Sequence, residues 1–168
     1  MEGTVKPAER SGVRGWLFFF AITLVAIGPL VRVVSLFTSY APVAAVAAQY
    51  PRFVVIYAVT CFVEVALIAW SVMAGAAILN ARPHAKRLAT WFLLMNPIVM
   101  FLCTIAYGLA DLPPSAMDVI SRVGAALTAR AVLYSIIWGL YLKLSRRVRE
   151  TFPGAVKGPS APKVAVAR

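Results

Sequence analysis

Four apolar runs constrain this chain more than any other feature of its sequence. A membrane-spanning helix needs roughly 20 predominantly apolar residues, and each run reaches about that length. Because lipid offers no hydrogen-bond partner to an exposed backbone, runs of this kind fold as helices. With 61% hydrophobic and only 14% charged residues, the chain is also too apolar for a soluble globule. The sequence therefore predicts an all-α integral membrane four-helix bundle, with helices at about 15–37, 53–79, 88–109 and 119–142.

The basic residues predict how this bundle is oriented. The net charge is +11, and most of the basic residues fall into three clusters, at 6–14, 82–87 and 143–149, which four crossings place on the same side of the membrane. By the positive-inside rule, both termini are then cytoplasmic. Because the charge is split among short connections instead of forming one patch, we do not expect nucleic-acid binding. The last cluster includes the candidates for contact with anionic lipid headgroups at the cytoplasmic face: Arg146, Arg147 and Arg149.

The two ends of the chain differ from the apolar middle. Residues 1–14 lack apolar periodicity and are predicted to be a cytoplasmic N-terminal lead, and residues 153–168 a disordered basic cytoplasmic tail. The transmembrane domain is then 15–152. A cleaved signal peptide is the alternative for the first run, although its small-residue stretch comes later than the roughly 15–30 residues such peptides occupy.

Two opposite charges lie at the same predicted depth inside the bilayer. Glu64 and Arg130 are each eleven residues from the outer end of their predicted helix, about 16 Å at about 1.5 Å per residue. A charge at the bilayer centre costs about 2.5–3.5 kcal/mol on insertion scales, so such residues usually face the bundle and pair. The depths predict an ion pair between Glu64 and Arg130, which would fix the register of the second and fourth helices.

Arg32 completes the predicted intramembrane charge cluster. It lies about five residues from the outer end of the first predicted helix, so its side chain reaches either outward to the headgroups or inward to Glu64. If both arginines turn inward, one carboxylate serves two guanidiniums. The positive charge left over would favour an anion such as a lipid phosphate.

Aromatic residues follow Arg130 along one face of the fourth helix. Tyr134, Trp138 and Tyr141 continue at steps of four, four and three residues. They pack inside the bundle as an aromatic belt, or they line a groove that holds a lipid chain.

Backbone signals add local detail. Gly28-Pro29 and Asn96-Pro97 predict kinks in the first and third helices, whose freed carbonyls neighbouring helices can satisfy. Ser71 and Gly75 offer a small-residue strip for close helix contact. Asp118 is a plausible cap for the fourth helix.

No pattern typical of an enzyme is present. The chain has no Ser/His/Asp set, no paired carboxylates, no glycine-rich phosphate loop and no metal-ligand spacing. We therefore expect no catalytic, cofactor-binding or metal-binding residues.

The closing segment SIIWGLYLKLSRRVRETF resembles the end of an uncharacterised family of small bacterial membrane proteins, domain of unknown function 2569. In that family a Trp-Ile-Pro-Tyr step precedes Ser-Lys-Arg-Val-Lys-x-Thr-Phe, which correspond to residues 138–141 and 145–152. Gly139-Leu140 stands in place of the usual Ile-Pro.

The opening of the first run, Gly15-Trp16-Leu17 and then Gly28-Pro29-Leu30-x-Arg32, is similar to the family's start. Glu64 and Arg130 also look like family positions. The resemblance covers about residues 15–152 and implies four helices in a bacterial inner membrane. It implies no reaction.

Two function hypotheses follow from these observations. The first is a non-enzymatic inner-membrane accessory of the cell envelope that binds a lipid headgroup near its buried charges. The second is a subunit of an oligomeric channel or small-anion transporter that uses Arg32, Glu64 and Arg130 along its path. The sequence leaves open the lipid, the solute, a protein partner, a homo-oligomer and movement at the two prolines.

Overall fold

The computed structural model describes residues 15–46, 49–145 and 148, and for 39–46 it describes the backbone alone. Its described residues form helices and connections without a strand, and four helical rods are long and apolar enough to cross a membrane. The predicted all-α four-helix membrane fold is confirmed. The elements are α1 (Trp16–Ile22), a π-helical turn η1 (Thr23–Ile27), α2 (Gly28–Val46), α3 (Pro51–Leu79), α4 (Ala85–Ala106), a 3₁₀ turn η2 (Tyr107–Leu109) and α5 (Pro114–Leu144).

Two helix ends differ by five or more residues from the predicted ones. The first rod continues as α2 to Val46 instead of ending near residue 37, so Arg32 lies much further from the rod's end than expected. The last helix begins at Pro114, and Pro113 occupies the N-cap position, so the predicted Asp118 cap is wrong. Proline is well suited to the first helical position because its missing N–H would have no partner there. Asp118 instead accepts from Arg122 one turn later.

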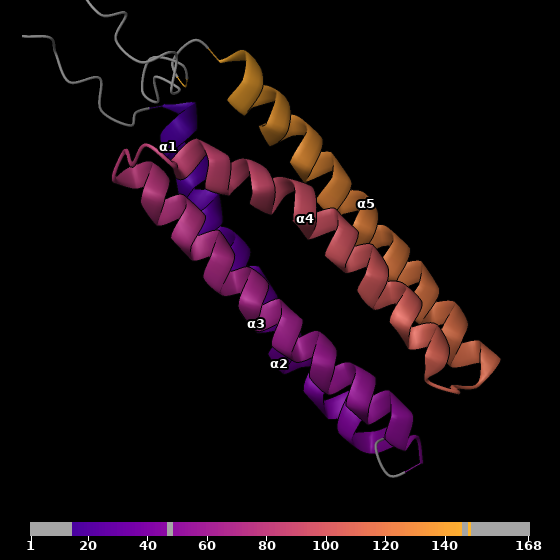
Figure 1. The fold of residues 1–168 in the computed structure, drawn as a ribbon. Helices are drawn as coiled ribbons and strands as arrows, with labels where there is room; N and C mark the ends of the chain where they lie inside the picture. The colour runs from indigo at the N-terminus through magenta and orange to yellow at the C-terminus, as the bar shows by residue number, and fades with distance from the viewer. Residues whose placement is uncertain (1–14, 47–48, 146–147, 149–168) are drawn as a thin grey trace, which may run out of the picture.

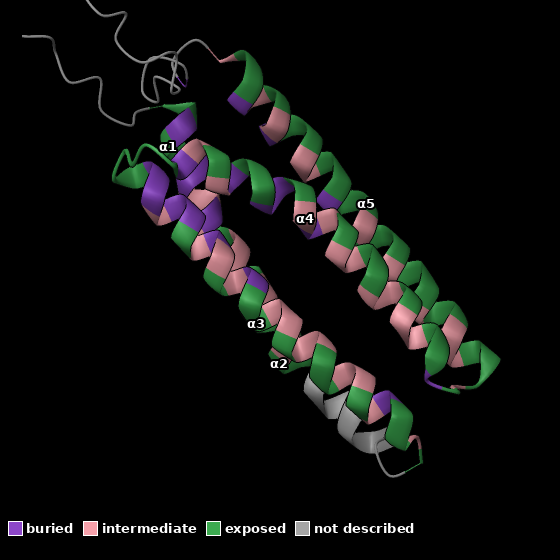
Figure 2. Cartoon of the chain, viewed as in Figure 1, coloured by how far each residue is buried: buried purple, intermediate pink, exposed green. Residues whose placement is uncertain are grey.

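The helices pack most tightly at one end of the bundle, which we call the terminal end. It contains the start of α1, the connection between α3 and α4 and the end of α5 (Figure 1). Buried residues are concentrated there, whereas the opposite, far end is mostly half-buried or exposed (Figure 2). In the core, large side chains of α1 and η1 lie against alanines of α3 and α4: Leu17, Phe20, Leu24, Ala74, Ala77, Ala85 and Ala89. Larger side chains of α3, α4 and α5 complete it: Leu67, Ile78, Phe92, Leu93, Trp138 and Leu142.

The first rod is interrupted by the π turn that precedes Pro29. The amide of Gly28 donates to the Thr23 carbonyl, five residues back, and Pro29 has no amide proton to give. The Leu24 carbonyl therefore has neither of its usual helical partners. Ser71 supplies one, since its hydroxyl donates to the Leu24 oxygen at 2.7 Å.

The small-residue strip of α3 makes this contact close, as expected. A Cβ atom placed on Gly75 would lie 2.5 Å from Cγ2 of Val25 and 3.0 Å from the Ala21 oxygen. Only a glycine fits at this crossing. Ser71 and Gly75 together hold α3 against the irregular turn of the first rod.

Pro97 has a matching arrangement in α4. It leaves the Leu93 carbonyl without its helical donor, and the hydroxyl of Ser135 in α5 donates to that oxygen at 2.6 Å. Figure 1 shows α4 changing direction near its middle, as the proline predicts. The ribbons of α3 and α4 are closer at both ends than between them (Figure 1). Both freed carbonyls are thus satisfied by serines of neighbouring helices.

Candidate functional site

Arg32, Glu64 and Asn96 meet from three helices near the middle of the bundle. One guanidinium nitrogen of Arg32 donates to a carboxylate oxygen of Glu64, and the other terminal nitrogen donates to the side-chain oxygen of Asn96. The side chains of Arg32 and Glu64 are only 19% and 17% exposed, and Asn96 is buried. The cluster is charge-balanced, and it connects α2 to both α3 and α4.

The predicted pair between Glu64 and Arg130 is therefore wrong. Arg130 is exposed, and the carboxylate of Glu64 pairs with Arg32. The reason is the order of the helices, because α5 packs along α4, which lies between α5 and α3 (Figure 1). Equal depth does not bring two residues together when their helices are not neighbours. Of the two alternatives for Arg32, the structure shows the inward one, with its side chain on Glu64.

The aromatic face of α5 makes a contact with α1 and its π turn. Trp138 stacks on Phe20 with ring centroids 4.5 Å apart, and the hydroxyl oxygens of Tyr134 and Thr23 are 2.9 Å apart. Tyr141 packs edge-on against Trp138. Among the described residues, those of the first rod cover this face. They therefore fill the predicted groove of Tyr134, Trp138 and Tyr141.

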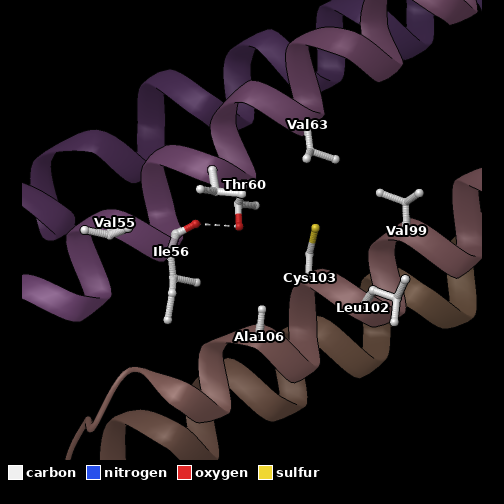
Figure 3. Close-up of a pocket in the computed structure, with 9 residues that line it drawn as sticks. Val55, Ile56, Thr60, Val63, Val99, Leu102, Cys103 and Ala106 are labelled. Atoms are coloured by element: carbon white, nitrogen blue, oxygen red, sulfur yellow. Dashed lines mark hydrogen bonds between the residues drawn. The ribbon is translucent and has the colours of Figure 1, made fainter.

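A cavity that the sequence did not predict lies between α3 and α4. Its volume is about 430 Å³, and it is open to the surface. The side chains of Thr60 and Cys103 point toward each other across it (Figure 3). Thr60 donates to the Ile56 carbonyl of its own helix at 2.9 Å, so its hydroxyl proton is already used. The remaining walls are aliphatic: Val55, Ile56, Val59, Val63, Val99, Leu102 and Ala106.

Polar and aromatic contacts bound this cavity along the helix axes. Val63 and Val99 of its lining are adjacent to the Arg32–Glu64–Asn96 cluster, since Val63 precedes Glu64 and Val99 follows Asn96 by three residues. At the far end, Phe53 of α3 lies against Tyr107 with ring centroids 5.9 Å apart. An exposed ion pair joins α3 to the connection after α4, through Arg52 and Asp111. The cavity therefore lies between the charged cluster and the aromatic contact of the far end, and it is open to the surface.

The sequence held a signal for Asn96, which the predicted charge cluster did not include. An asparagine inside an apolar run needs partners for its amide, just as a charge does. Its position before Pro97 drew attention to the backbone instead. The candidate lipid contacts Arg146, Arg147 and Arg149 lie outside the described residues.

Comparison with known proteins gives one family. No curated protein and no solved structure matches the chain. The model of a family described as a protein of unknown function, DUF2569, matches residues 10–153. That span contains all four helices, the charged cluster and the cavity. This chain, a four-helix membrane protein, belongs to the DUF2569 family.

Proposed function

We propose that this protein is a non-enzymatic accessory of the bacterial inner membrane that holds one lipid acyl chain in the cavity between α3 and α4. The observation that carries the proposal is the cavity itself. It lies between two membrane-length helices, its walls are aliphatic apart from Thr60 and Cys103, and it is open to the surface. Pockets of roughly 300–1,000 Å³ are the usual size for bound small molecules, and this one is at the lower end of that range.

The surroundings favour an acyl chain over a polar solute. The hydroxyl of Thr60 already donates to its own helix, so a polar ligand would lose its water without gaining that donor. A hydrocarbon chain has no hydration to lose on entry from the bilayer, and its contacts with aliphatic side chains offset the cost of ordering it. The bend of α4 at Pro97 keeps the two helices apart beside it, which supports a site formed before the lipid binds.

The charged cluster gives less support to a bound headgroup or an anion path. The guanidinium of Arg32 already donates to Glu64 and Asn96, and the charges of the pair cancel. Arg130, the third residue of the predicted path, lies apart from the cluster and is exposed. In our proposal the cluster fixes three helices around the cavity, and the lipid headgroup lies at the membrane surface.

The proposed orientation places the terminal end in the cytoplasm. Arg82, Lys86 and Arg87 cluster at the connection between α3 and α4, which belongs to that end. The positive-inside rule then makes both termini cytoplasmic. Fusions of a fluorescent protein and of alkaline phosphatase to the C-terminus test this: we expect fluorescence and no phosphatase activity, and the reverse result would overturn the orientation.

Native mass spectrometry of the detergent-extracted protein tests the lipid site. Cys103→Phe places a ring where the side chain points into the cavity (Figure 3), so we expect the retained lipid of the parent to be lost. Val65→Phe is the matched control, because Val65 is 55% exposed on α3 and does not line the cavity. We expect this variant to keep the lipid.

Two results would contradict the proposal. The first is equal lipid retention in the parent and the Cys103→Phe variant at equal helical content. The second is equal loss in both variants, which would show that the retained lipid covers the outer surface of the bundle. Fragment masses of the released lipid identify its headgroup.

A further inference from the structure

Arg130 is a cation on an exposed face deep within the membrane-spanning part of α5. It lies sixteen residues from Pro114 and fourteen from Leu144, so about 24 Å and 21 Å of helix separate it from the two ends. The hydrocarbon core is roughly 30 Å thick, so Arg130 falls close to its middle. A headgroup phosphate is then farther away than an arginine side chain reaches. A charge at this depth is costly, and such residues usually pair with an opposite charge.

The described residues offer no free carboxylate at that level. Its six acidic residues are at 2, 9, 64, 111, 118 and 150, so Glu64 is the only one inside a predicted apolar run. The carboxylate of Glu64 is taken by Arg32. Asp111 and Asp118 are at the far end, paired with Arg52 and Arg122. Among the described residues, Arg130 therefore has no carboxylate partner, which favours one from outside the chain.

The face that carries Arg130 has the geometry of a helix-docking seam. Along α5, exposed positions recur at alternating steps of four and three residues, the spacing at which one helix packs lengthwise against another. Ala126 lies one turn from Arg130 and leaves room for a close approach. All positions of this seam are exposed: Val119, Val123, Ala126, Arg130, Leu133, Ile137, Leu140 and Leu144.

We infer that this seam docks a transmembrane helix of another protein, one that carries a single carboxylate, Asp or Glu, at mid-membrane depth. A buried polar position in an apolar seam specifies the partner and its register, because any other helix leaves a charge without a partner. A second parallel copy joined through the same seam would place two Arg130 side chains against each other. Charge complementarity therefore selects a different chain.

Energy transfer between the full chain and model helices tests this inference. The protein, with a donor fused at its C-terminus, is reconstituted in phosphatidylcholine vesicles with acceptor-labelled Leu/Ala transmembrane peptides. The peptides have Glu, Gln or Leu at their central position. We expect energy transfer to reach half of its maximum at a lower peptide fraction for the Glu peptide than for the Leu peptide. The difference should be roughly threefold or more, which is the size that interhelical polar contacts reach.

Substitutions in the same helix then identify the contact. Arg130→Leu should remove the preference for Glu, and Arg130→Glu should transfer it to a peptide with a central Lys. Arg122→Leu, at the far end of the same helix, is the matched control and should leave the preference unchanged. Circular dichroism establishes that each variant keeps its helical content, and the gain of Lys preference in Arg130→Glu cannot come from misfolding.

Three outcomes would overturn the inference. Equal binding of the Glu and Leu peptides would show that the seam does not select a carboxylate. Association of the protein with itself that requires Arg130, without a peptide preference, would assign the seam to a second copy. Energy transfer that depends on anionic lipid in the vesicles and is equal for all three peptides would assign Arg130 to a lipid phosphate.

Discussion

The serine that replaces the hydrogen bond lost at Pro97 provides a quantitative test of the packing. Ser135 donates to the Leu93 oxygen at 2.6 Å, and without it that carbonyl loses its only donor among the described contacts. Interhelical hydrogen bonds in membranes contribute about 0.6 kcal/mol on average and about 1.7 at most. An acceptor left without a partner belongs at the upper end, so Ser135→Ala should lose about 1.5 kcal/mol. Alanine's better helix propensity offsets up to about 0.5 kcal/mol of this loss, which leaves a net loss of about 1 kcal/mol.

Equilibrium unfolding in SDS, followed by helical circular dichroism, measures this loss. Ser121→Ala is the matched control, because Ser121 is an exposed serine of the same helix and gains only the propensity. Pro97→Ala completes a double-mutant cycle, because it restores an amide able to donate to the Leu93 carbonyl oxygen. In that background Ser135→Ala should cost little. An equal cost in both backgrounds would refute the explanation, because the serine would then act independently of the proline.

Three further predictions follow from single contacts. Arg32→Leu should lower the free energy of unfolding by roughly 2 kcal/mol, less than the roughly 3–5 kcal/mol of fully buried pairs, and adding Glu64→Leu should recover part of it; no recovery in SDS unfolding would show that the charge left behind is not the cause. Gly75→Leu should cost about 1–3 kcal/mol by overpacking the contact with the first rod, whereas Gly139→Ala, which meets no atom within 4 Å, should be tolerated in the same assay. Arg52→Ala removes an exposed ion pair, so thermal unfolding should show a loss of no more than about 1 kcal/mol in the free energy of unfolding. A larger loss would show that this pair holds the far end together.

The fold was predictable because lipid leaves few alternatives for an apolar chain. Run length alone indicated four helices, and Gly28-Pro29 and Asn96-Pro97 indicated where two rods would be irregular. The expectation that neighbouring helices satisfy the freed carbonyls was correct, and Ser71 and Ser135 do so. Which residue would do it was not predictable, because that depends on how each helix is rotated about its axis.

The pairing of charges failed for the same physical reason. Counting along a helix gives depth, but neither the rotation of the helix nor the identity of its neighbours. Glu64 was correctly expected to pair, yet its partner is Arg32 because α2 is next to α3 and α5 is not. The cavity also could not be predicted from the sequence, since it depends on how far α3 and α4 separate beside Pro97.

The π turn of the first rod has a consequence for how insertions and deletions act on this protein. A π turn absorbs one extra residue, which rotates everything after it by about 100°. Counted on an uninterrupted helix, Arg32 would lie about 70° from the centre of the face formed by Leu17, Phe20, Ala21 and Leu24; with one residue absorbed, it lies about 30° from it. Deleting one residue within Thr23–Ile27 would leave an apolar rod of nearly the same length. It would remove the residue that the π turn absorbs, so Arg32 would keep its direction toward Glu64 and Asn96. One residue inserted at the same place would instead turn Arg32 away from both partners, so the chain would still insert into a membrane while losing the contact that joins its three central helices.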